Sequence, residues 1–231
     1  LAHVMLCVVS GTAAHYFGDT LCIGVGGGHH SGRTDYVGRI LNLLADLGID
    51  EETVIMVSSD HGENLGEMNV YGDHQTADQI TTHIPMILHW PGLLEGGRYS
   101  AKHYHMDIFA TVLELLERKV PDAWDGESFA TVLKNGSDQG RDFLVVSQAA
   151  WACQRGVRFG DYLYLNTRHD AFHLWDDELL FNVKSDPHQQ YNQAHTSLAE
   201  LSEGRDLLGQ WLGDMMVDAA RGRDPHDNVM Q

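Results

Sequence analysis

A helix-like segment, a short acidic loop and a strongly apolar run follow one another between residues 36 and 57. Apolar residues recur at helical spacing over residues 36–47, and Gly48 then provides a typical helix end. Residues 53–57 are apolar and mostly β-branched, as expected of a strand that is buried on both faces of a parallel sheet. A helix leading into such a strand is half of a doubly wound unit. The sequence therefore predicts an α/β fold.

The sequence pattern changes after the turn-forming cluster at residues 135–138. Before this cluster we expect a second strand at residues 84–90 and a second helix at 106–118. Beyond it, short alternating segments predict a small antiparallel sheet with strands at 143–147, 156–159, 162–166 and 179–183, followed by a helix at 198–216. The predicted organisation is a flexible Gly- and His-rich lead-in (1–34), an α/β part (35–137), and a small antiparallel-sheet subdomain with a C-terminal helix and tail (138–231).

The charge balance narrows the classes of partner. The chain has 231 residues, with 15 Lys and Arg against 33 Asp and Glu, a formal net charge of −18. This acidity disfavours binding to nucleic acid, where Lys and Arg neutralise phosphates, and to an anionic membrane surface. An anionic substrate would need a local positive charge, which a bound metal ion supplies. The oligomeric state is not predicted.

Targeting signals are not evident in the sequence. No run of eighteen apolar residues is present, and no Lys or Arg precedes the apolar patch at residues 4–9. We therefore expect no membrane partner and a cytoplasmic or periplasmic location. The chain begins at Leu1 rather than Met, which suggests a piece of a longer or processed protein.

The sharpest chemical signal is the pair Asp60-His61, just after the buried strand at residues 53–57. Ligands of open α/β sheets bind beyond the carboxyl ends of the strands. A carboxylate and an imidazole at that place can both bind one cation, and Gly62 would allow the sharp turn that brings them together. The alternative is that Asp60 caps a following helix and His61 lies on the surface.

His74 lies thirteen residues after His61, in a polar loop that can fold back over the strand end. It could contact a bound anion, donate a proton or join the metal. The chain has fifteen histidines, so a solvent-exposed loop histidine is the alternative.

The residues around these candidates resemble the sulfatase family of the alkaline-phosphatase-like superfamily. The order and spacing agree over about residues 35–216, and the similarity is carried by residues 53–67, 82–92, 105–115, 124–129, 157–164 and 180–188. The resemblance implies the C-terminal part of an alkaline-phosphatase-like doubly wound sheet. It further implies a metal-dependent sulfuric ester hydrolase, in which a metal ion and fixed donors stabilise the charge that develops on the ester oxygens.

The resemblance also assigns roles to the residues. It places Asp60 and His61 on the catalytic divalent cation, for which Ca²⁺ is the expected metal. His74 is nearest to the place of a family lysine that contacts the sulfate, with one residue of apparent insertion.

Several parts of the family site have no counterpart in this sequence. The family nucleophile is a formylglycine made from Cys in Cys-x-Pro-Ser-Arg, and Cys7, Cys22 and Cys153 all lack that context. Two N-terminal Asp ligands also have no counterpart. The chain is therefore expected to be a fragment without the nucleophile, inactive by itself.

The predicted small sheet supplies weaker candidates for substrate binding. Arg155, Arg168, His169 and His173 suit an anionic sugar, because Arg pairs with anions and rings stack on sugars. The alternative is an ordinary sheet surface. The expected substrate is a small anionic ester, with a sulfated sugar as one candidate. Asp107, just before Ile108, is interpreted as a structural residue at a helix start.

Three other functions stay open. A phosphonate monoesterase or phosphodiesterase shares the Asp-His-Gly run, and would use Mn²⁺ or Zn²⁺. A phosphoethanolamine transferase shares a Ser-Asp-His-Gly-Glu run, but such enzymes are membrane-anchored and the Asp186-Pro187 motif argues against them. A non-catalytic fragment or pseudoenzyme is favoured by the missing nucleophile.

Overall fold

A computed structural model describes residues 3–9, 14–17, 20–24, 33–218 and 224–228. The chain divides into two compact units. The first comprises residues 1–61, 84–98 and 131–137, and the second comprises 62–83, 99–130 and 138–231. Within the described ranges, no helix is both long and apolar enough to cross a membrane.

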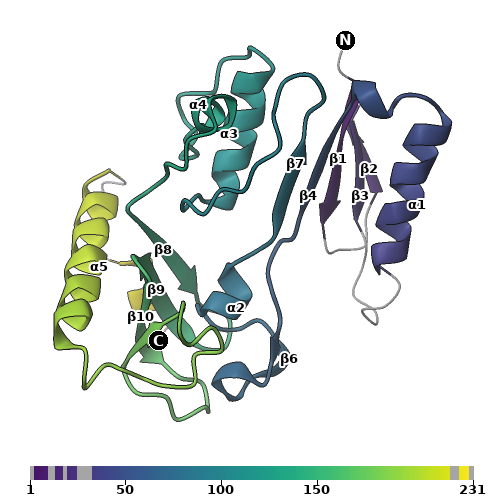
Figure 1. Cartoon of the computed structure of the whole chain (residues 1–231). Helices are drawn as coiled ribbons and strands as arrows, with labels where there is room; N and C mark the ends of the chain where they lie inside the picture. Colours follow the sequence, from purple (N-terminus) through teal and green to yellow (C-terminus); the bar gives the residue numbers. More distant parts are fainter. Residues whose placement is uncertain (1–2, 10–13, 18–19, 25–32, 219–223, 229–231) are drawn as a thin grey trace. The chain divides into compact units, whose positions relative to one another are not determined.

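A five-stranded mixed sheet forms the first unit, in the order β2-β3-β1-β4-β7 (Figure 1). Its strands are β1 (His3–Val9), β2 (Ala14–Phe17), β3 (Thr20–Gly24), β4 (Thr53–Ser58) and β7 (Met86–His89). Strands β3, β1 and β4 are parallel, whereas β2 and β7 join the two edges antiparallel. Val54 and Met56 of β4 are buried, which agrees with the predicted apolar strand. The mixed α/β fold expected from the sequence is thus confirmed.

Helix α1 (Arg33–Asp46) and the short 3₁₀ helix η1 (Asp50–Glu52) lead into β4. The helix begins and ends slightly earlier than the predicted segment at 36–47. Gly48 follows it with φ of +66°, the left-handed conformation that favours glycine at a helix end. No strand is predicted from the pattern of residues 1–34, but the structure has β1, β2 and β3 there.

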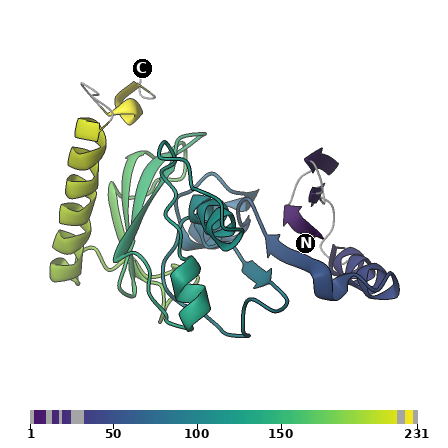
Figure 2. The same cartoon turned by 90° about the horizontal axis from the view of Figure 1, so that it is seen from above.

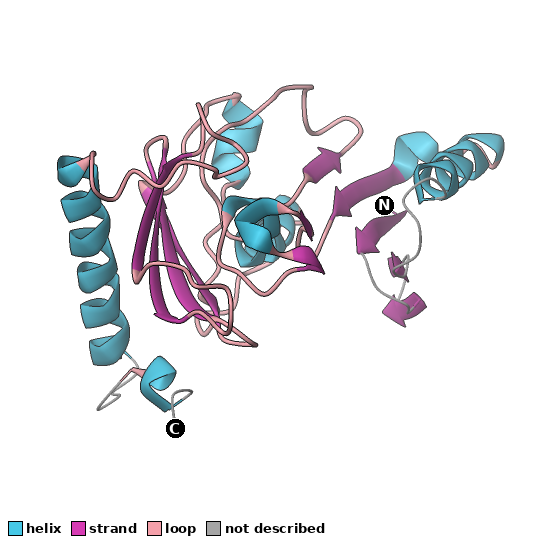
Figure 3. Cartoon of the chain, turned by 90° about the horizontal axis from the view of Figure 1, so that it is seen from below, coloured by secondary structure: helices cyan, strands magenta, loops and turns pink. Residues whose placement is uncertain are grey.

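A four-stranded antiparallel sheet, in the order β11-β10-β9-β8, forms the centre of the second unit. Its strands are β8 (Phe143–Gln148), β9 (Cys153–Phe159), β10 (Tyr162–His169) and β11 (Glu178–Asn182). All four agree with predicted segments, although β9 and β10 are longer. Helix α5 (Leu198–Asp218) lies along one face of this sheet (Figures 2 and 3).

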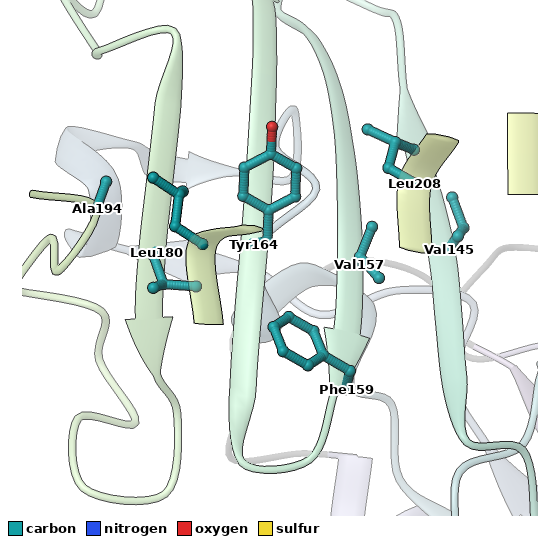
Figure 4. Packing of buried hydrophobic residues seen from close by; sticks show 8 residues of the cluster. Val145, Val157, Phe159, Tyr164, Leu180, Ala194 and Leu208 are labelled. Atoms are coloured by element: carbon teal, nitrogen blue, oxygen red, sulfur yellow. The ribbon is translucent and has the colours of Figure 1, made fainter. Parts of the chain in front are cut away.

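The core between α5 and the sheet is a cluster of buried side chains (Figure 4). Tyr164 and Leu180 at its centre are at most 2% exposed. Gly204 of α5 lies so close to the sheet that an added Cβ would be 2.6 Å from the Cβ of Tyr164. A glycine is therefore needed where the helix crosses β10. The other members of the cluster are Val145, Val157, Phe159, Ala194, Leu201 and Leu208.

The opposite face of the sheet packs against the segment 62–83. A second apolar cluster joins Ala77 and Met68 to side chains of β10 and β11. The Gln154 side chain accepts a hydrogen bond from the Ala77 N–H at 3.2 Å. This segment holds η2 (Glu67–Asn69), α2 (Gln79–Thr82) and a hairpin of β5 (Asn64–Leu65) with β6 (Tyr71–Asp73).

The sequence analysis divided the chain at residue 137. In the structure, residues 62–83 and 99–130 belong to the same unit as the small sheet. Segment 99–130 contains helix α3 (His105–Leu115), and the remaining described elements are α4 (Ala130–Asn135) and η3 (Pro225–Asn228). The Asp107 carboxylate accepts a hydrogen bond from the Tyr104 N–H at the start of α3 and forms an ion pair with Arg141. The predicted structural role of Asp107 is therefore confirmed. The sequence pattern showed that the type of segment changes after residues 135–138, but it did not show which segments pack together.

Candidate active site

Asp60 and His61 follow the carboxyl end of β4, where the apolar strand gives way to polar residues. The Ser58 hydroxyl donates to the Pro85 carbonyl at 3.1 Å, which ties the end of β4 to the segment before β7. The Ser59 hydroxyl donates to the carbonyl of His61. These two bonds restrain the backbone on both sides of Asp60, so its carboxylate extends from a fixed position.

The side chains of Asp60 and His61 are arranged as a pair of metal-donor groups. Asp60 Oδ1 accepts the His61 N–H at 3.0 Å, and Asp60 Oδ2 lies 3.7 Å from His61 Nε2. Both side chains are about one-third exposed, at 38% and 35%. Two donor atoms at this separation can both contact one divalent cation, because metal–ligand distances to carboxylate oxygen and imidazole nitrogen are ~2.0–2.6 Å. The residues therefore fit a divalent metal, and no helix follows Asp60 for it to cap.

Gly62 has a different role from the sharp turn expected from the sequence. Its N–H donates to the Thr81 carbonyl at 2.9 Å. A Cβ at this position would lie 1.8 Å from the carbonyl oxygen of Ile80. Glycine is required because the chain passes directly against the backbone of α2, and not because of an unusual φ angle.

The β5–β6 hairpin brings Glu63 and His74 together in the second unit. Asn64 faces Asp73 across the ladder, so the residues just outside this pair, Glu63 and His74, lie opposite each other. His74 Nδ1 is 3.4 Å from Glu63 Oε2, and the imidazole is about half exposed. The Gln148 side chain of β8 donates to the His74 carbonyl at 3.0 Å, which anchors the hairpin to the small sheet.

Asp73 connects His74 to a second histidine. Burial alone would raise the pKa of Asp73, but hydrogen bonds from His74 and Gln75 and the nearby imidazoles of His74 and His173 lower it overall. His173 is stacked on Trp175, with ring centroids 4.3 Å apart. His173 Nε2 and Gln75 Oε1 are both buried without a hydrogen-bond partner in the described part of the chain. Two predicted site residues, His74 and His173, are thus near one carboxylate.

The other predicted substrate contacts lie in different surroundings. Arg155 is 6% exposed and pairs with Asp224, to which its Nη2 donates at 2.6 Å. Arg168 Nη2 lies 3.3 Å from the same carboxylate, and its side chain is one-third exposed. His169 Nδ1 accepts the N–H of Ala171 at 3.0 Å. Arg155 therefore has a buried structural ion pair, whereas Arg168, His169 and His173 retain some exposure.

Glu63, Asp73 and Gln75 were not singled out from the sequence, although they surround His74. The signal that could have found them is the antiparallel register. Once residues 64 and 73 are paired, residue 63 must face residue 74. The sequence shows a loop in this region but not the register, since the turn contains the non-glycine residues Met68 and Asn69 at positive φ.

Comparisons with known proteins find similarity to sulfatases over part of the chain. The sequence model of the family described as "Sulfatase" matches residues 30–118. An ulvan-active sulfatase of Formosa agariphila is 28% identical over 174 residues, which are 71% of this chain and 33% of that protein. An N-acetylglucosamine-6-O-sulfatase of Bacteroides thetaiotaomicron is 26% identical over 68% of this chain and 29% of its own length. The chain thus spans about a third of the length of these relatives.

Solved structures show the same fold. A protein in complex with its substrate D-glucosamine-2-N,6-O-disulfate superposes with a TM-score of 0.68 at 24% identity, over 83% of this chain and 39% of that one. A phosphonate monoester hydrolase from Silicibacter pomeroyi superposes with a TM-score of 0.60 at 23% identity, again over 83% of this chain and 39% of that one. The two units therefore belong to an alkaline-phosphatase-like fold.

Proposed function

We propose that this chain forms part of a sulfuric ester hydrolase and that it carries ligands of a divalent cation, because the sulfatase family model matches residues 30–118 and the relatives named above are sulfatases. The observation that carries this proposal is the pair of donor atoms at the end of β4, Asp60 Oδ2 and His61 Nε2, 3.7 Å apart. Ca²⁺ is the proposed metal because of the Asp60 carboxylate and the resemblance to sulfatases, whereas the His61 imidazole would also suit Zn²⁺, the metal of the phospho-type alternative. When bound, such a cation stabilises negative charge on the ester oxygens.

His74 is proposed to contact the anionic group of the substrate. Its Nδ1 faces Glu63, so contact with the anion would be made through Nε2. A neutral imidazole has only one N–H. The imidazolium form is therefore needed for Nδ1–H to donate to Glu63 while Nε2–H donates to the anion. Glu63 Oε2, 3.4 Å from Nδ1, would hold the ring in that orientation.

The substrate class is proposed to be a sulfated sugar. The two sulfatase relatives described above act, by their names, on ulvan and on N-acetylglucosamine sulfate. Arg168, His169 and His173 remain the proposed sugar contacts. Arg155 is omitted from them because its guanidinium is buried against Asp224.

Metal binding tests the site independently of turnover. The 231-residue chain is titrated with Ca²⁺ by calorimetry, together with Asp60→Ala, His74→Ala and a control, His195→Ala, which removes an exposed histidine elsewhere. Asp60→Ala should weaken Ca²⁺ binding by at least about tenfold, whereas the two histidine variants should bind like the parent. If His74→Ala loses the metal while Asp60→Ala keeps it, the assigned roles are wrong.

Activity assays then separate the alternatives. The 231-residue chain by itself is proposed to hydrolyse no aryl sulfate, because it has no Cys-x-Pro-Ser-Arg nucleophile motif. In a longer protein that contains this chain, His74→Ala should lower turnover by roughly a hundred- to a thousandfold, as for the loss of one donor to developing charge. A phosphonate monoesterase is the second candidate, favoured by the likeness to the solved phosphonate hydrolase. Preference for an aryl phosphonate over an aryl sulfate would establish it.

A further inference from the structure

A pocket of about 520 Å³ lies entirely within the second unit. The loop 65–69 of the hairpin forms one side, and the segment 188–192 after β11 forms another. This volume is within the range of small-molecule sites, roughly 300–1,000 Å³. Asp60, His61 and His74 are absent from its lining, although Trp175, which lines the pocket, also stacks on His173.

The lining of this pocket has an apolar part that is held rigidly. Leu179 and Phe181 of β11 line it and are 5% and 3% exposed. Trp175 lies beside them, and its indole N–H donates to the Met68 carbonyl at 3.0 Å. This bond fixes the indole, because a ring that is tied at its polar edge cannot rotate freely. His173 is stacked on one face of the indole, so the pocket offers the rest of this ring next to a small aliphatic and aromatic patch.

Gln189 provides a buried donor in the same lining. Its side-chain Oε1 accepts the Gln79 N–H at 2.7 Å. A backbone N–H can only donate, so this bond determines which end of the amide is oxygen and which is nitrogen. Nε2 is then left buried without a partner in the described part of the chain, on a residue that is 4% exposed. Buried donors without acceptors are rare and costly, and an oxygen acceptor on a ligand would satisfy this one.

Within the described part of the chain, the lining of the pocket contains one carboxylate. Glu67 provides it and lies 3.0 Å from the His188 ring. The hydrogen bond from the Leu65 N–H and the partner His188 lower the pKa of Glu67, although burial acts in the opposite direction. The carboxylate is thus ionised at neutral pH. It can accept hydrogen bonds from hydroxyl groups, but it repels a sulfate or a carboxylate.

We propose that this pocket binds a neutral N-acetylated sugar ring. The acetamide carbonyl accepts from Gln189 Nε2, and the acetamide methyl packs on Leu179 and Phe181. The C–H face of the pyranose ring lies on Trp175, and ring hydroxyls donate to Glu67. A sugar without the acetamide lacks both the strong acceptor and the methyl group. A sulfated sugar brings an anion towards Glu67.

The matched ligands for the test are N,N′-diacetylchitobiose and cellobiose, which have the same glycosidic linkage and differ in the acetamido groups. Calorimetry on the 231-residue chain should show binding of diacetylchitobiose at millimolar concentration and at least tenfold weaker binding of cellobiose. Saturation-transfer NMR on the unmodified chain should give the strongest enhancement at the acetamide methyl. Absence of diacetylchitobiose binding, equal binding of cellobiose or a weak methyl signal would each overturn the proposal.

Variants locate the site. Gln189→Glu keeps the oxygen that accepts from Gln79 and replaces the orphan donor by a second oxygen. Gln193→Glu makes the same chemical change outside the pocket lining. The first should weaken diacetylchitobiose binding at least tenfold and the second less than twofold; equal effects would contradict the assignment. Asp60→Ala should leave this binding unchanged, so the outcome is independent of the proposed hydrolase activity.

Discussion

The Asp107 carboxylate lies under the first turn of α3 and accepts four hydrogen bonds. The Tyr104 and Glu127 N–H groups each donate at 2.8 Å, and Arg141 donates through Nη2 at 2.8 Å and Nε at 3.1 Å. Asp107 is 1% exposed. In Asp107→Asn one oxygen becomes an NH₂ group that faces two donors, and the buried face of Arg141 loses its counter-charge. Breaking a buried pair in this way costs about 3–5 kcal/mol.

A surface ion pair gives the control. Lys119 and Asp122 are also close, at 2.7 Å, but their side chains are 77% and 84% exposed. Asp122→Asn should therefore change the free energy of unfolding by less than about 1 kcal/mol. Urea denaturation followed by circular dichroism measures both variants. If Asp107→Asn costs no more than Asp122→Asn, the reasoning from burial is refuted.

The pH dependence of the stability difference between the wild type and Asp107→Asn is a second check. Burial would raise the pKa of Asp107, but the hydrogen bonds and charge of Arg141 and the two backbone donors lower it overall. A carboxylate with a lowered folded-state pKa stabilises above the unfolded pKa of about 3.9, and this contribution is lost as the pH falls through the folded pKa. The difference in the free energy of unfolding between wild type and Asp107→Asn should therefore become smaller below about pH 4. A difference that grows in acid would contradict this account.

Two further predictions concern stability. Gly62→Ala places a methyl group 1.8 Å from the Ile80 oxygen and should destabilise the chain by more than about 2 kcal/mol. Gly209→Ala, in open space on α5, should stabilise it by about 0.5–1 kcal/mol. Thermal melts compare the two variants, and similar changes in melting temperature would be contrary evidence. Hydrogen bonds from Arg155 lower the pKa of Asp224 to about 2 despite its burial. About 2 kcal/mol of stability should therefore be lost between pH 4 and pH 2, and Asp224→Asn should abolish that loss in acid titrations. An acid transition that is the same in Asp224→Asn as in the wild type would contradict this prediction.

The fold was predictable where a local pattern has one structural meaning. Strand β4 and the strands β8 to β11 follow from apolar and alternating runs, because a strand buried on one or both faces leaves that periodicity in its own residues. Strand β1 contains the apolar patch at residues 4–9, but a short apolar run alone does not distinguish a strand from other buried segments. Its position beside β4 depends on long-range pairing that no local pattern records.

The candidate site was predictable only in part, for the same reason. Asp60 and His61 could be found because they follow a recognisable strand and resemble a family motif. Glu63 required the hairpin register, and the buried position of Arg155 depends on Asp224, which is 69 residues away in sequence. Local sequence therefore indicates which side chains follow the end of a strand. It does not indicate which distant carboxylate pairs with a given Arg side chain.

The alternation of the two units along the chain limits how this protein can be taken apart. The polypeptide passes from one unit to the other five times, so neither unit corresponds to one continuous stretch of gene. A shortened chain that starts at residue 138 would retain the four strands and α5 but lose Ala77, which covers the second face of the sheet, and Asp107, which binds Arg141. Transplanting the small sheet between relatives as a single cassette would separate it from packing partners. Recombination should instead exchange residues 62–83, 99–130 and 138–231 together.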